Sequence, residues 1–228
     1  MVIECIGLPG SGKTYLLKGL ERELKAGGSE VVNVTELAVS RLSWKAAAGL
    51  MRAGVFTDRR SGAVGKRLEE ILRREGPLQS RFGIYENADY TIRSAAALIA
   101  LYGKMGKSPK VYLFDEGLIH TLIKLCADCM ISDDVFLEMA AEAVKGVRGE
   151  WTVVYNEITP EQCMTSIRAR DRHICTFDEL SDSQLERILA EYERLDECYS
   201  AHYPVLKVNR AQELQARTAL ILRGIGQL

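Results

Sequence analysis

A chain of 228 residues is long enough for one α/β domain with an insertion, and it can bury a core without disulfides or a structural metal. Its 30 basic and 31 acidic side chains give a formal net charge of −1, so nucleic acid is not expected as a main partner, because a duplex-binding surface normally makes a chain strongly basic. No apolar run approaches the ~18 residues that span a bilayer, so no membrane partner is expected either.

The first predicted element is a strand over Val2–Ile6. Within it, Glu4 stands where a secretion signal would carry positive charge, and the apolar run leads directly into a glycine-rich motif. The chain also has six scattered cysteines, which a cytosolic protein of this size has no need to pair. Together these features predict a cytoplasmic protein.

The segment after this strand, Gly7-Leu8-Pro9-Gly10-Ser11-Gly12-Lys13-Thr14, fits the pattern G-x-x-x-x-G-K-[ST] without a mismatch. Glycines allow unusual backbone dihedrals, so successive N–H groups can point inward at phosphate oxygens, and the helix that begins near Lys13 adds its positive N-terminal end. Lys13 is expected to reach the β- and γ-phosphates, and the Thr14 hydroxyl to bind Mg²⁺. A chance match in a glycine-rich turn is the alternative, but an apolar strand precedes the motif and a helical pattern follows it. The predicted nucleotide-binding residues are Gly7, Pro9, Gly10, Ser11, Gly12, Lys13 and Thr14.

Four further apolar, partly β-branched runs are predicted as strands: Val31–Val34, Val111–Phe114, Thr152–Tyr155 and Val205–Val208. Their residues are continuously apolar, as expected for strands covered on both faces, and the segments between them have helical periodicity. This alternation predicts βαβ crossovers and a parallel sheet. The stretch of about 36–108 is too long for one crossover and is predicted as a helical insertion. No linker or repeat divides the chain, so 1–228 is predicted as a single domain.

The strand over Val111–Phe114 ends in Asp115-Glu116-Gly117. Acids at the carboxyl end of a parallel strand stand at the crevice where open α/β sheets bind ligands. Asp115 is therefore predicted to hold Mg²⁺, directly or through water, and Glu116 to accept the proton of an attacking hydroxyl or to orient a substrate. The alternative is a pair of solvated acids that cap the next helix.

Two later helices have clear predicted starts. Thr159-Pro160-Glu161-Gln162 combines an N-cap threonine, a proline at the first helical position and a capping-box glutamine. Ser181-Asp182-Ser183-Gln184 has the same capping-box spacing ahead of a helix over Leu185–Tyr199.

These features resemble the thymidylate kinase and deoxynucleoside kinase families of nucleotide-kinase-like P-loop kinases. The similar features are the loop Gly7–Thr14, the long helical insertion, the strand that ends in an acid, and the run from Thr152 to Arg172, which resembles their fourth strand and lid helix. The resemblance implies a three-layer α/β/α fold with a five-stranded parallel sheet in the order 2-3-1-4-5 and a lid at about 168–180. Family members usually follow the third-strand Asp with Arg, whereas this chain has Glu116, so the role of position 116 stays open.

The resemblance also implies that the arginines near the lid close over the phosphates. Arg168 and Arg172 are four residues apart and would share one face of a helix. Guanidinium groups suit phosphoryl transfer because they stabilise charge that spreads over the equatorial oxygens. The alternative is a solvated helix end whose cations are favoured by the helix dipole.

An acceptor site is expected under the helical insertion. Glu36 follows the second strand, where related nucleoside kinases carry an acid that activates the acceptor hydroxyl, although a lone Glu is also a common helix-start residue. Arg41, Tyr90 and Arg93 are further candidates for acceptor binding, and surface charge would explain Arg41 equally well. Cys126 and Cys129 have C-x-x-C spacing, but no second pair completes a zinc set, so two buried helical cysteines are the preferred interpretation.

The sequence thus predicts a kinase that uses ATP and Mg²⁺ and transfers the γ-phosphoryl group to a small molecule, with a nucleoside or nucleotide as the first choice. A sugar or other metabolite alcohol is the second choice, and a modified base in a polynucleotide the third. A P-loop ATPase or switch coupled to a protein partner is the alternative from another class. The absence of an Asn-Lys-x-Asp guanine signature favours ATP. The acceptor and the oligomeric state, a homodimer included, stay open.

Overall fold

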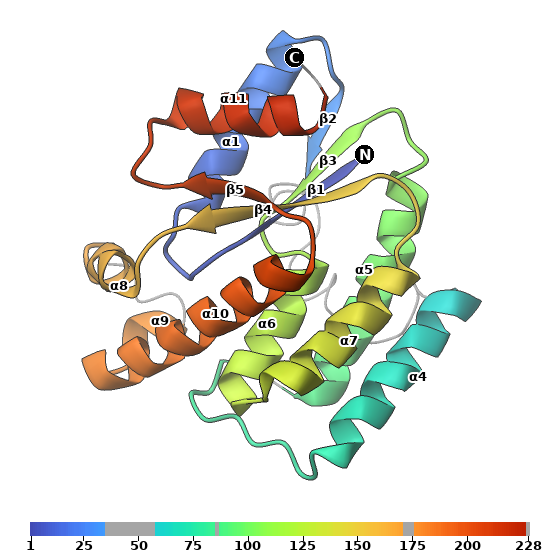
Figure 1. Ribbon diagram of the computed structural model, residues 1–228, viewed down its shortest axis with the longest axis vertical. Coiled ribbons are helices and arrows are strands. Elements are labelled where there is room, and N and C mark those ends of the chain that lie inside the picture. Colours follow the sequence, from blue (N-terminus) through green and yellow to red (C-terminus); the bar gives the residue numbers. More distant parts are fainter. Residues whose placement is uncertain (35–57, 85–86, 171–175, 227–228) are drawn as a thin grey trace.

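The computed structural model of the chain describes residues 1–34, 58–84, 87–170 and 176–226. In this part of the chain five parallel strands form one sheet in the order β2-β3-β1-β4-β5, which confirms the predicted fold (Figure 1). The strands are β1 (Val2–Ile6), β2 (Val31–Asn33), β3 (Val111–Phe114), β4 (Trp151–Glu157) and β5 (Leu206–Asn209). The first strand of the chain therefore lies at the centre of the sheet.

Helices cover both faces of the sheet and make three layers (Figure 1). One face is covered by α1 (Lys13–Ala26) and α11 (Leu214–Gly224). The opposite face is covered by α5 (Ala88–Met105), α6 (Leu118–Cys129) and α10 (Asp182–His202), against which α4 (Arg59–Arg74) and α7 (Asp133–Gly146) pack. The short helices α8 (Pro160–Arg168) and α9 (Thr176–Glu179) follow β4.

The side chains of β1 alternate between two apolar cores. Val2 and Ile6 belong to the larger core, which contains residues of α5, α6 and α10. Ile3 and Cys5 belong to the smaller core with α1 and α11. Both faces of this strand are buried, and this explains its continuous apolar sequence.

Both predicted helix starts are present. At α8 the Thr159 hydroxyl accepts the N–H of Gln162 at 3.4 Å, with proline at the first helical position. The reciprocal side-chain bond of a full capping box is not found at α8 among the described residues. At α10 it is found: Ser181 and Gln184 bond reciprocally.

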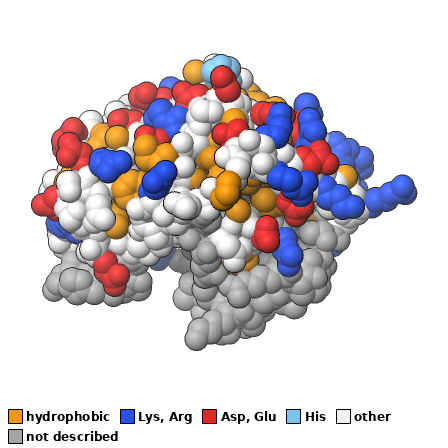
Figure 2. Space-filling model, turned by 90° about the horizontal axis from the view of Figure 1, so that it is seen from below, with side chains coloured by type: hydrophobic (Ala, Val, Ile, Leu, Met, Phe, Trp, Pro, Cys, Tyr) orange, Lys and Arg blue, Asp and Glu red, His pale blue; other side chains and the backbone are white. Residues whose placement is uncertain are grey.

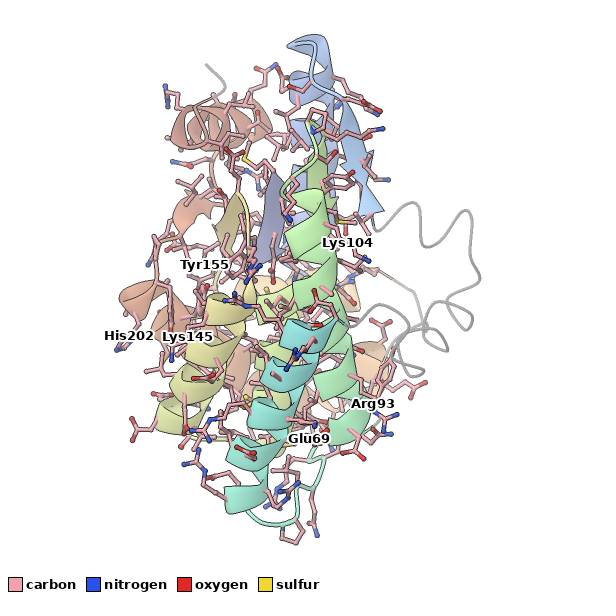
Figure 3. The ribbon with its side chains drawn as sticks, turned by 90° about the vertical axis from the view of Figure 1, so that its right-hand side faces the viewer. Glu69, Arg93, Lys104, Lys145, Tyr155 and His202 are labelled. Carbon is pink, nitrogen blue, oxygen red and sulfur yellow. The ribbon has the colours of Figure 1, made fainter. Side chains whose placement is uncertain are left out.

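The described part of the predicted insertion consists of α4 and α5. The Asp58 carboxylate caps α4 by accepting the N–H groups of Arg60 at 3.0 Å and Ser61 at 2.8 Å. Helix α5 runs towards the sheet, with Arg93 near its beginning and Lys104 near its end (Figure 3). Because α5 is largely buried against α4 and α6, this part of the insertion belongs to the main body of the protein.

Lys and Arg side chains gather at the end of the molecule where α4 lies (Figure 2). Two of them form ion pairs with acids of α4 and α7: Arg67 with Glu70 at 3.0 Å, and Arg74 with Glu138 at 2.5 Å. This basic group is therefore partly neutralised by neighbouring acids. Among the described residues, no helix combines the length and the hydrophobicity that crossing a lipid bilayer requires.

Candidate functional site

The loop between β1 and α1 depends on glycine. The backbone φ angles are 131° at Gly7, 90° at Gly10 and 85° at Gly12, which L side chains rarely adopt. Gly12 directly precedes α1 and has no side chain that could cap that helix. The positive N-terminal end of α1 and its first N–H groups therefore face the loop, in an arrangement that favours a bound anion.

Lys13, the first residue of α1, folds back across this loop. Its Nζ donates to the backbone oxygens of Gly7 at 2.8 Å and Leu8 at 3.1 Å, and the side chain is buried. The Ser11 hydroxyl, also buried, has no hydrogen-bond partner among the described residues. A lysine ammonium, an unpaired hydroxyl and a helix N-terminus thus meet at the loop, and all three are donors suited to phosphate oxygens.

Thr14 and Asp115 are brought together because β1 and β3 are neighbouring parallel strands. The Thr14 Oγ1 donates to Asp115 Oδ2, and the Asp115 side chain is buried. Hydroxyl and carboxylate oxygens are the ligands that Mg²⁺ prefers, and one or two of them suffice when phosphates and waters fill the remaining positions. The residues present therefore fit Mg²⁺.

The turn after Asp115 is held by Glu4 of the central strand. The Glu4 carboxylate is fully buried and accepts the N–H groups of Ile119 at 2.7 Å and His120 at 3.0 Å, so it caps α6 from the sheet. It also accepts the Tyr102 hydroxyl at 3.0 Å. Burial outweighs these hydrogen bonds and raises the pKa of Glu4 to about 7. The sequence signal for this residue is an acid inside an otherwise apolar strand.

Glu116 is exposed at the same edge of the sheet, directly after Asp115. It is followed by Gly117, the N-cap of α6. A carboxylate in this place can receive a proton from a molecule in the crevice, since it is solvated and next to the acid that fits Mg²⁺. The structure thus places Asp115 at the loop and leaves Glu116 accessible beside it.

Asn156, near the end of β4, is hydrogen-bonded to the loop. Its Nδ2 donates to the backbone oxygen of Ser11 at 2.9 Å, and its Oδ1 accepts the guanidinium of Arg217 at 3.3 Å. All three groups are buried. The backbone of β4 also approaches the loop closely, because a Cβ at Gly7 would lie 2.7 Å from the Asn156 carbonyl oxygen. No local sequence pattern marks this support, because Asn156 and Ser11 are 145 residues apart.

Two arginines lie beside the loop at Gly10, one just after β5 and the other just after α8. Arg210, which follows β5, donates to the Gly10 carbonyl at 2.7 Å and to the Ser166 hydroxyl at 3.0 Å. Arg170 lies just after α8, and a Cβ at Gly10 would come within 2.9 Å of its guanidinium. The rule that pointed to Asp115, a polar residue at the carboxyl end of a parallel strand, would also have pointed to Arg210.

Arg168 makes its contacts with α9, with the turn that follows it and with the first residue of α10. Its guanidinium donates to the Asp182 carboxylate at 2.7 Å and to the backbone oxygens of Leu180 at 2.6 Å and Asp178 at 3.3 Å. Helix α8 ends at Arg168, so the expected helical face shared with Arg172 is not formed by this helix. Arg172 itself lies outside the described residues.

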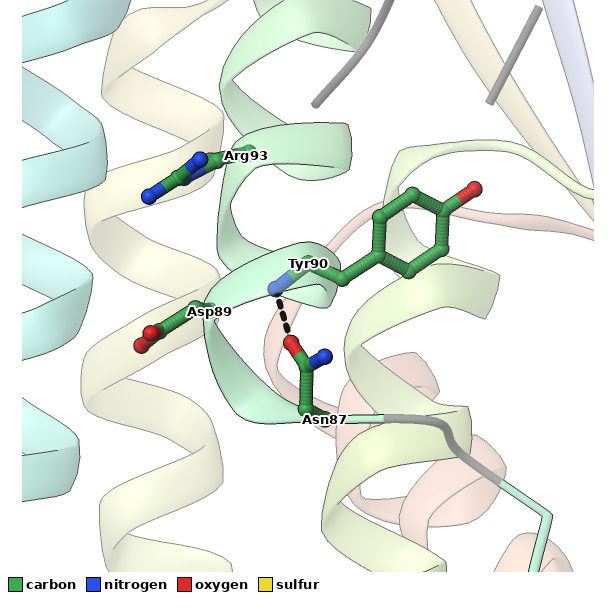
Figure 4. Close-up of a pocket in the computed structure, with 4 residues that line it drawn as sticks. All are labelled: Asn87, Asp89, Tyr90 and Arg93. Atoms are coloured by element: carbon green, nitrogen blue, oxygen red, sulfur yellow. Dashed lines mark hydrogen bonds between the residues drawn. The ribbon is translucent and has the colours of Figure 1, made fainter. Parts of the chain in front are cut away.

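The acceptor-site candidates of α5 line a cavity of about 280 Å³ together with Asn87 and Asp89 (Figure 4). Asp89 and Arg93 extend to one side of the helix, whereas the ring of Tyr90 extends to the other. The Asn87 side chain caps α5 by accepting the N–H of Tyr90 at 2.6 Å. Two other candidates, Glu36 and Arg41, lie outside the described residues.

The two cysteines with C-x-x-C spacing lie on α6. Cys126 is buried and Cys129 partly buried on α6, and no group of three or more His, Cys, Asp or Glu side chains there could hold a metal ion. Burial raises the pKa of the Cys126 thiol. Both cysteines thus lie on one helix, as predicted, although only Cys126 is fully buried.

Comparison with known proteins identifies the fold. No family model matches the chain, and no curated protein matches its sequence. Among solved structures, deoxyadenosine kinase from M. mycoides with bound dATP is 13% identical, with 99% of each chain covered and a TM-score of 0.53. The same enzyme with the products dCMP and dCDP is 13% identical, with 99% of this chain and 98% of the other covered and a TM-score of 0.52. Its complex with dCTP is 14% identical over the full length of both chains, with a TM-score of 0.50. The chain therefore has a nucleotide-kinase-like P-loop fold.

Proposed function

We propose that this protein is a kinase that transfers the γ-phosphoryl group of ATP to a small-molecule acceptor and uses Mg²⁺. The observation that carries this proposal is the hydrogen bond between Thr14 and Asp115 beside the glycine loop, Gly7–Thr14. The Lys13 ammonium folds back onto the backbone of the same loop. This arrangement combines donors for phosphate oxygens with a hydroxyl–carboxylate pair for a divalent cation. The structures of similar fold support the same class, since they are of a deoxyadenosine kinase in complex with nucleotides.

The loop residues of this chain would bind the triphosphate. Lys13 would turn from its own backbone towards the β- and γ-phosphates, and Thr14 and Asp115 would hold Mg²⁺, which supplies charge neutralisation at the phosphates. Arg170 and Arg210 approach the loop at Gly10 and would bind phosphate or base groups of the nucleotide there. The role of Arg168 and Arg172 as lid arginines that close over the phosphates stays a prediction.

The acceptor would lie beside Glu116, with a nucleoside or nucleotide as the first choice. Glu116 is exposed next to the proposed Mg²⁺ ligand, so it is our preferred proton acceptor, and Glu36 is the second candidate. Tyr90 and Arg93 line a cavity and stay candidates for acceptor binding, together with Arg41. A cytoplasmic location is part of this proposal.

The test is ADP release from Mg·ATP in the presence of separate deoxynucleosides, nucleoside monophosphates, sugars and polyols. We expect one acceptor class to stimulate ADP release strongly. Lys13→Ala should reduce the stimulated rate by about 100-fold or more, because it removes a cation that neutralises the transferring group. Lys25→Ala is the matched control, since Lys25 lies on the same helix but pairs with Glu21 at 2.5 Å on the exposed surface.

Two outcomes would contradict the kinase proposal. Steady ADP release that no acceptor changes would favour a partner-coupled ATPase. Equal rates for Lys13→Ala and Lys25→Ala would show that the glycine loop takes no part in the reaction. Asp115→Asn provides a second check, because it should raise the Mg²⁺ concentration needed for half-maximal rate while the fold is kept.

A further inference from the structure

A chain of hydrogen bonds runs from α11 through the end of β4 to the glycine loop. Arg217 Nη1 donates to Asn156 Oδ1 at 3.3 Å, and Asn156 Nδ2 donates to the backbone oxygen of Ser11 at 2.9 Å. Asn156 has no solvent exposure, Arg217 is 5% exposed, and Ser11 is buried as well. In such a water-poor environment hydrogen bonds are electrostatically stronger than at the surface and polarise one another.

The direction of this chain is fixed by the chemistry of its two ends. A guanidinium has donors only, so Arg217 must face the oxygen of the Asn156 amide. A backbone carbonyl is an acceptor only, so Ser11 must face the nitrogen of the same amide. The amide of Asn156 therefore has one orientation that satisfies both neighbours. Its dipole and that of the loop peptide lie head to tail, with the positive charge of Arg217 behind them.

The last link of the chain is the peptide between Ser11 and Gly12. Its carbonyl oxygen faces Asn156, and because the peptide is planar and trans, the N–H of Gly12 points to the opposite side. Gly12 directly precedes α1, whose first N–H groups have no acceptors within the helix. Asn156 thus holds, from the side of β4, a peptide whose N–H adds to the donors at this helix N-terminus.

The environment of Arg217 is unusual for a cation. Among the described residues it forms no ion pair, and its Nε has no hydrogen-bond partner although the side chain is buried. Burial lowers the pKa of Arg217, and the neighbouring Arg210 guanidinium acts in the same direction, but an arginine in a protein keeps its charge. A buried charge without a counter-charge costs folding free energy. An anion bound at the loop would compensate part of this cost.

We propose that Arg217 is a positioning residue for phosphate binding that acts through Asn156: it orients and polarises the Ser11–Gly12 peptide, so that the N–H of Gly12 becomes a stronger donor to a phosphate oxygen. The inference rests on the proposed nucleotide binding and deepens it. No bond is made or broken and no proton moves. Because the effect reaches only ligand atoms at the loop, it depends on the phosphates and not on the base or the sugar.

Calorimetric titration with Mg·ATP, and separately with inorganic tripolyphosphate and Mg²⁺, tests the role of Arg217. Arg217→Met keeps a long side chain but removes the charge and the donors. It should weaken the binding of both ligands about tenfold, or ~1.4 kcal/mol. Arg217→Lys keeps a cation that can donate to Asn156 Oδ1 and should retain most of the affinity. Arg223→Met is the matched control, because Arg223 lies on the same helix but is exposed.

Asn156→Asp tests the middle link of the chain. An aspartate has nearly the same size and can accept from Arg217, but it cannot donate to the carbonyl of Ser11. The affinity for Mg·ATP should therefore fall at least as far as in Arg217→Met, although the new ion pair compensates the buried guanidinium. Urea unfolding of each variant is measured in parallel, because a merely structural role would make the loss of affinity follow the loss of stability.

The outcomes separate this inference from the proposed function. Unchanged affinity in Arg217→Met, equal losses in Arg217→Met and Arg217→Lys, or a loss for Mg·ATP without one for tripolyphosphate would overturn the role of Arg217 and leave nucleotide binding intact. Failure of the wild type to bind either ligand would overturn both proposals.

Nuclear magnetic resonance of the wild type provides a test that does not depend on the folding of any variant. Because the hydrogen bonds of the chain polarise one another, Mg·ATP should move the resonances of the Gly12 amide proton and of the Asn156 Nδ2 protons downfield together. A shift of Gly12 without one of Asn156, or no shift of either, would overturn the inference.

Discussion

Replacement of Gly117 by alanine tests how tightly the turn after Asp115 is packed. The backbone φ of Gly117 is −99°, which alanine adopts readily, so the effect of the substitution comes from space alone. A Cβ at this position would lie 2.5 Å from Cγ of Glu4, and the Glu4 carboxyl carbon and the Tyr102 hydroxyl would be closer still. Both neighbours are fully buried.

The destabilisation has two parts. Overpacking in a buried site costs about 1–3 kcal/mol. To make room, the Glu4 side chain must also withdraw from the N–H groups of Ile119 and His120, and a buried donor left without its partner costs about 1–3 kcal/mol. We therefore expect Gly117→Ala to lower the free energy of unfolding by about 4 kcal/mol, a large part of the stability of a typical domain.

Urea unfolding followed by circular dichroism measures this change. Gly62→Ala is the control, because Gly62 lies within α4 and an added Cβ there meets nothing within 4 Å. The control should be more stable than the wild type by about 0.5–1 kcal/mol, since alanine has the higher helix propensity. If Gly117→Ala unfolds within about 0.5 kcal/mol of the wild type, the reasoning from packing is refuted, because this is the ordinary scatter of harmless substitutions.

Two further predictions concern the supports of the loop and of α6. The pKa of Glu4 is raised from 4.5 to about 7, so the folded protein binds more protons than the unfolded chain between these values, and stability falls as the pH rises through this range by up to about 1.4 kcal/mol per unit. Urea unfolding at about pH 5 and pH 7.5 should show that Glu4→Gln lacks this loss; the same dependence in both proteins would contradict the assignment. Arg210→Ala removes one hydrogen bond to the loop and one to Ser166 of α8, and it should weaken Mg·ATP binding about tenfold in calorimetric titration, or ~1.4 kcal/mol. Arg223→Ala, at the exposed end of α11, is its control, and equal affinities of the two variants would exclude a role for Arg210.

The strands could be predicted from the sequence because burial on both faces leaves a local, continuous apolar pattern. All five runs are strands in the structure, with ends that differ by a few residues; β4, for example, extends from Trp151 to Glu157. The glycine loop is equally local, since eight consecutive residues define it. The order of the strands could not be predicted from such local patterns, because periodicity carries no information on which strands are neighbours. The predicted order came from the family resemblance.

The parts of the site that the sequence did not reveal depend on contacts between distant residues. Arg210 contacts the carbonyl of Gly10, 200 residues away, and Asn156 contacts the loop from 145 residues away. No local pattern marks such pairs. The expected pairing of Arg168 and Arg172 assumed that the helix continues, whereas α8 ends at Arg168.

The central position of β1 has a consequence for how the protein is made. Of the five described strands β1 is synthesised first, but its two neighbours in the sheet come much later, since Val2 pairs with Tyr112 of β3 and with Trp151 of β4. Asn156, Arg210 and Arg217, which support the glycine loop, are synthesised later still. A nascent chain therefore carries the complete loop sequence long before the loop can take its shape. Until β3 and β4 have been synthesised, β1 is an apolar strand without its neighbours in the sheet, and exposed strands of this kind favour aggregation of a growing chain.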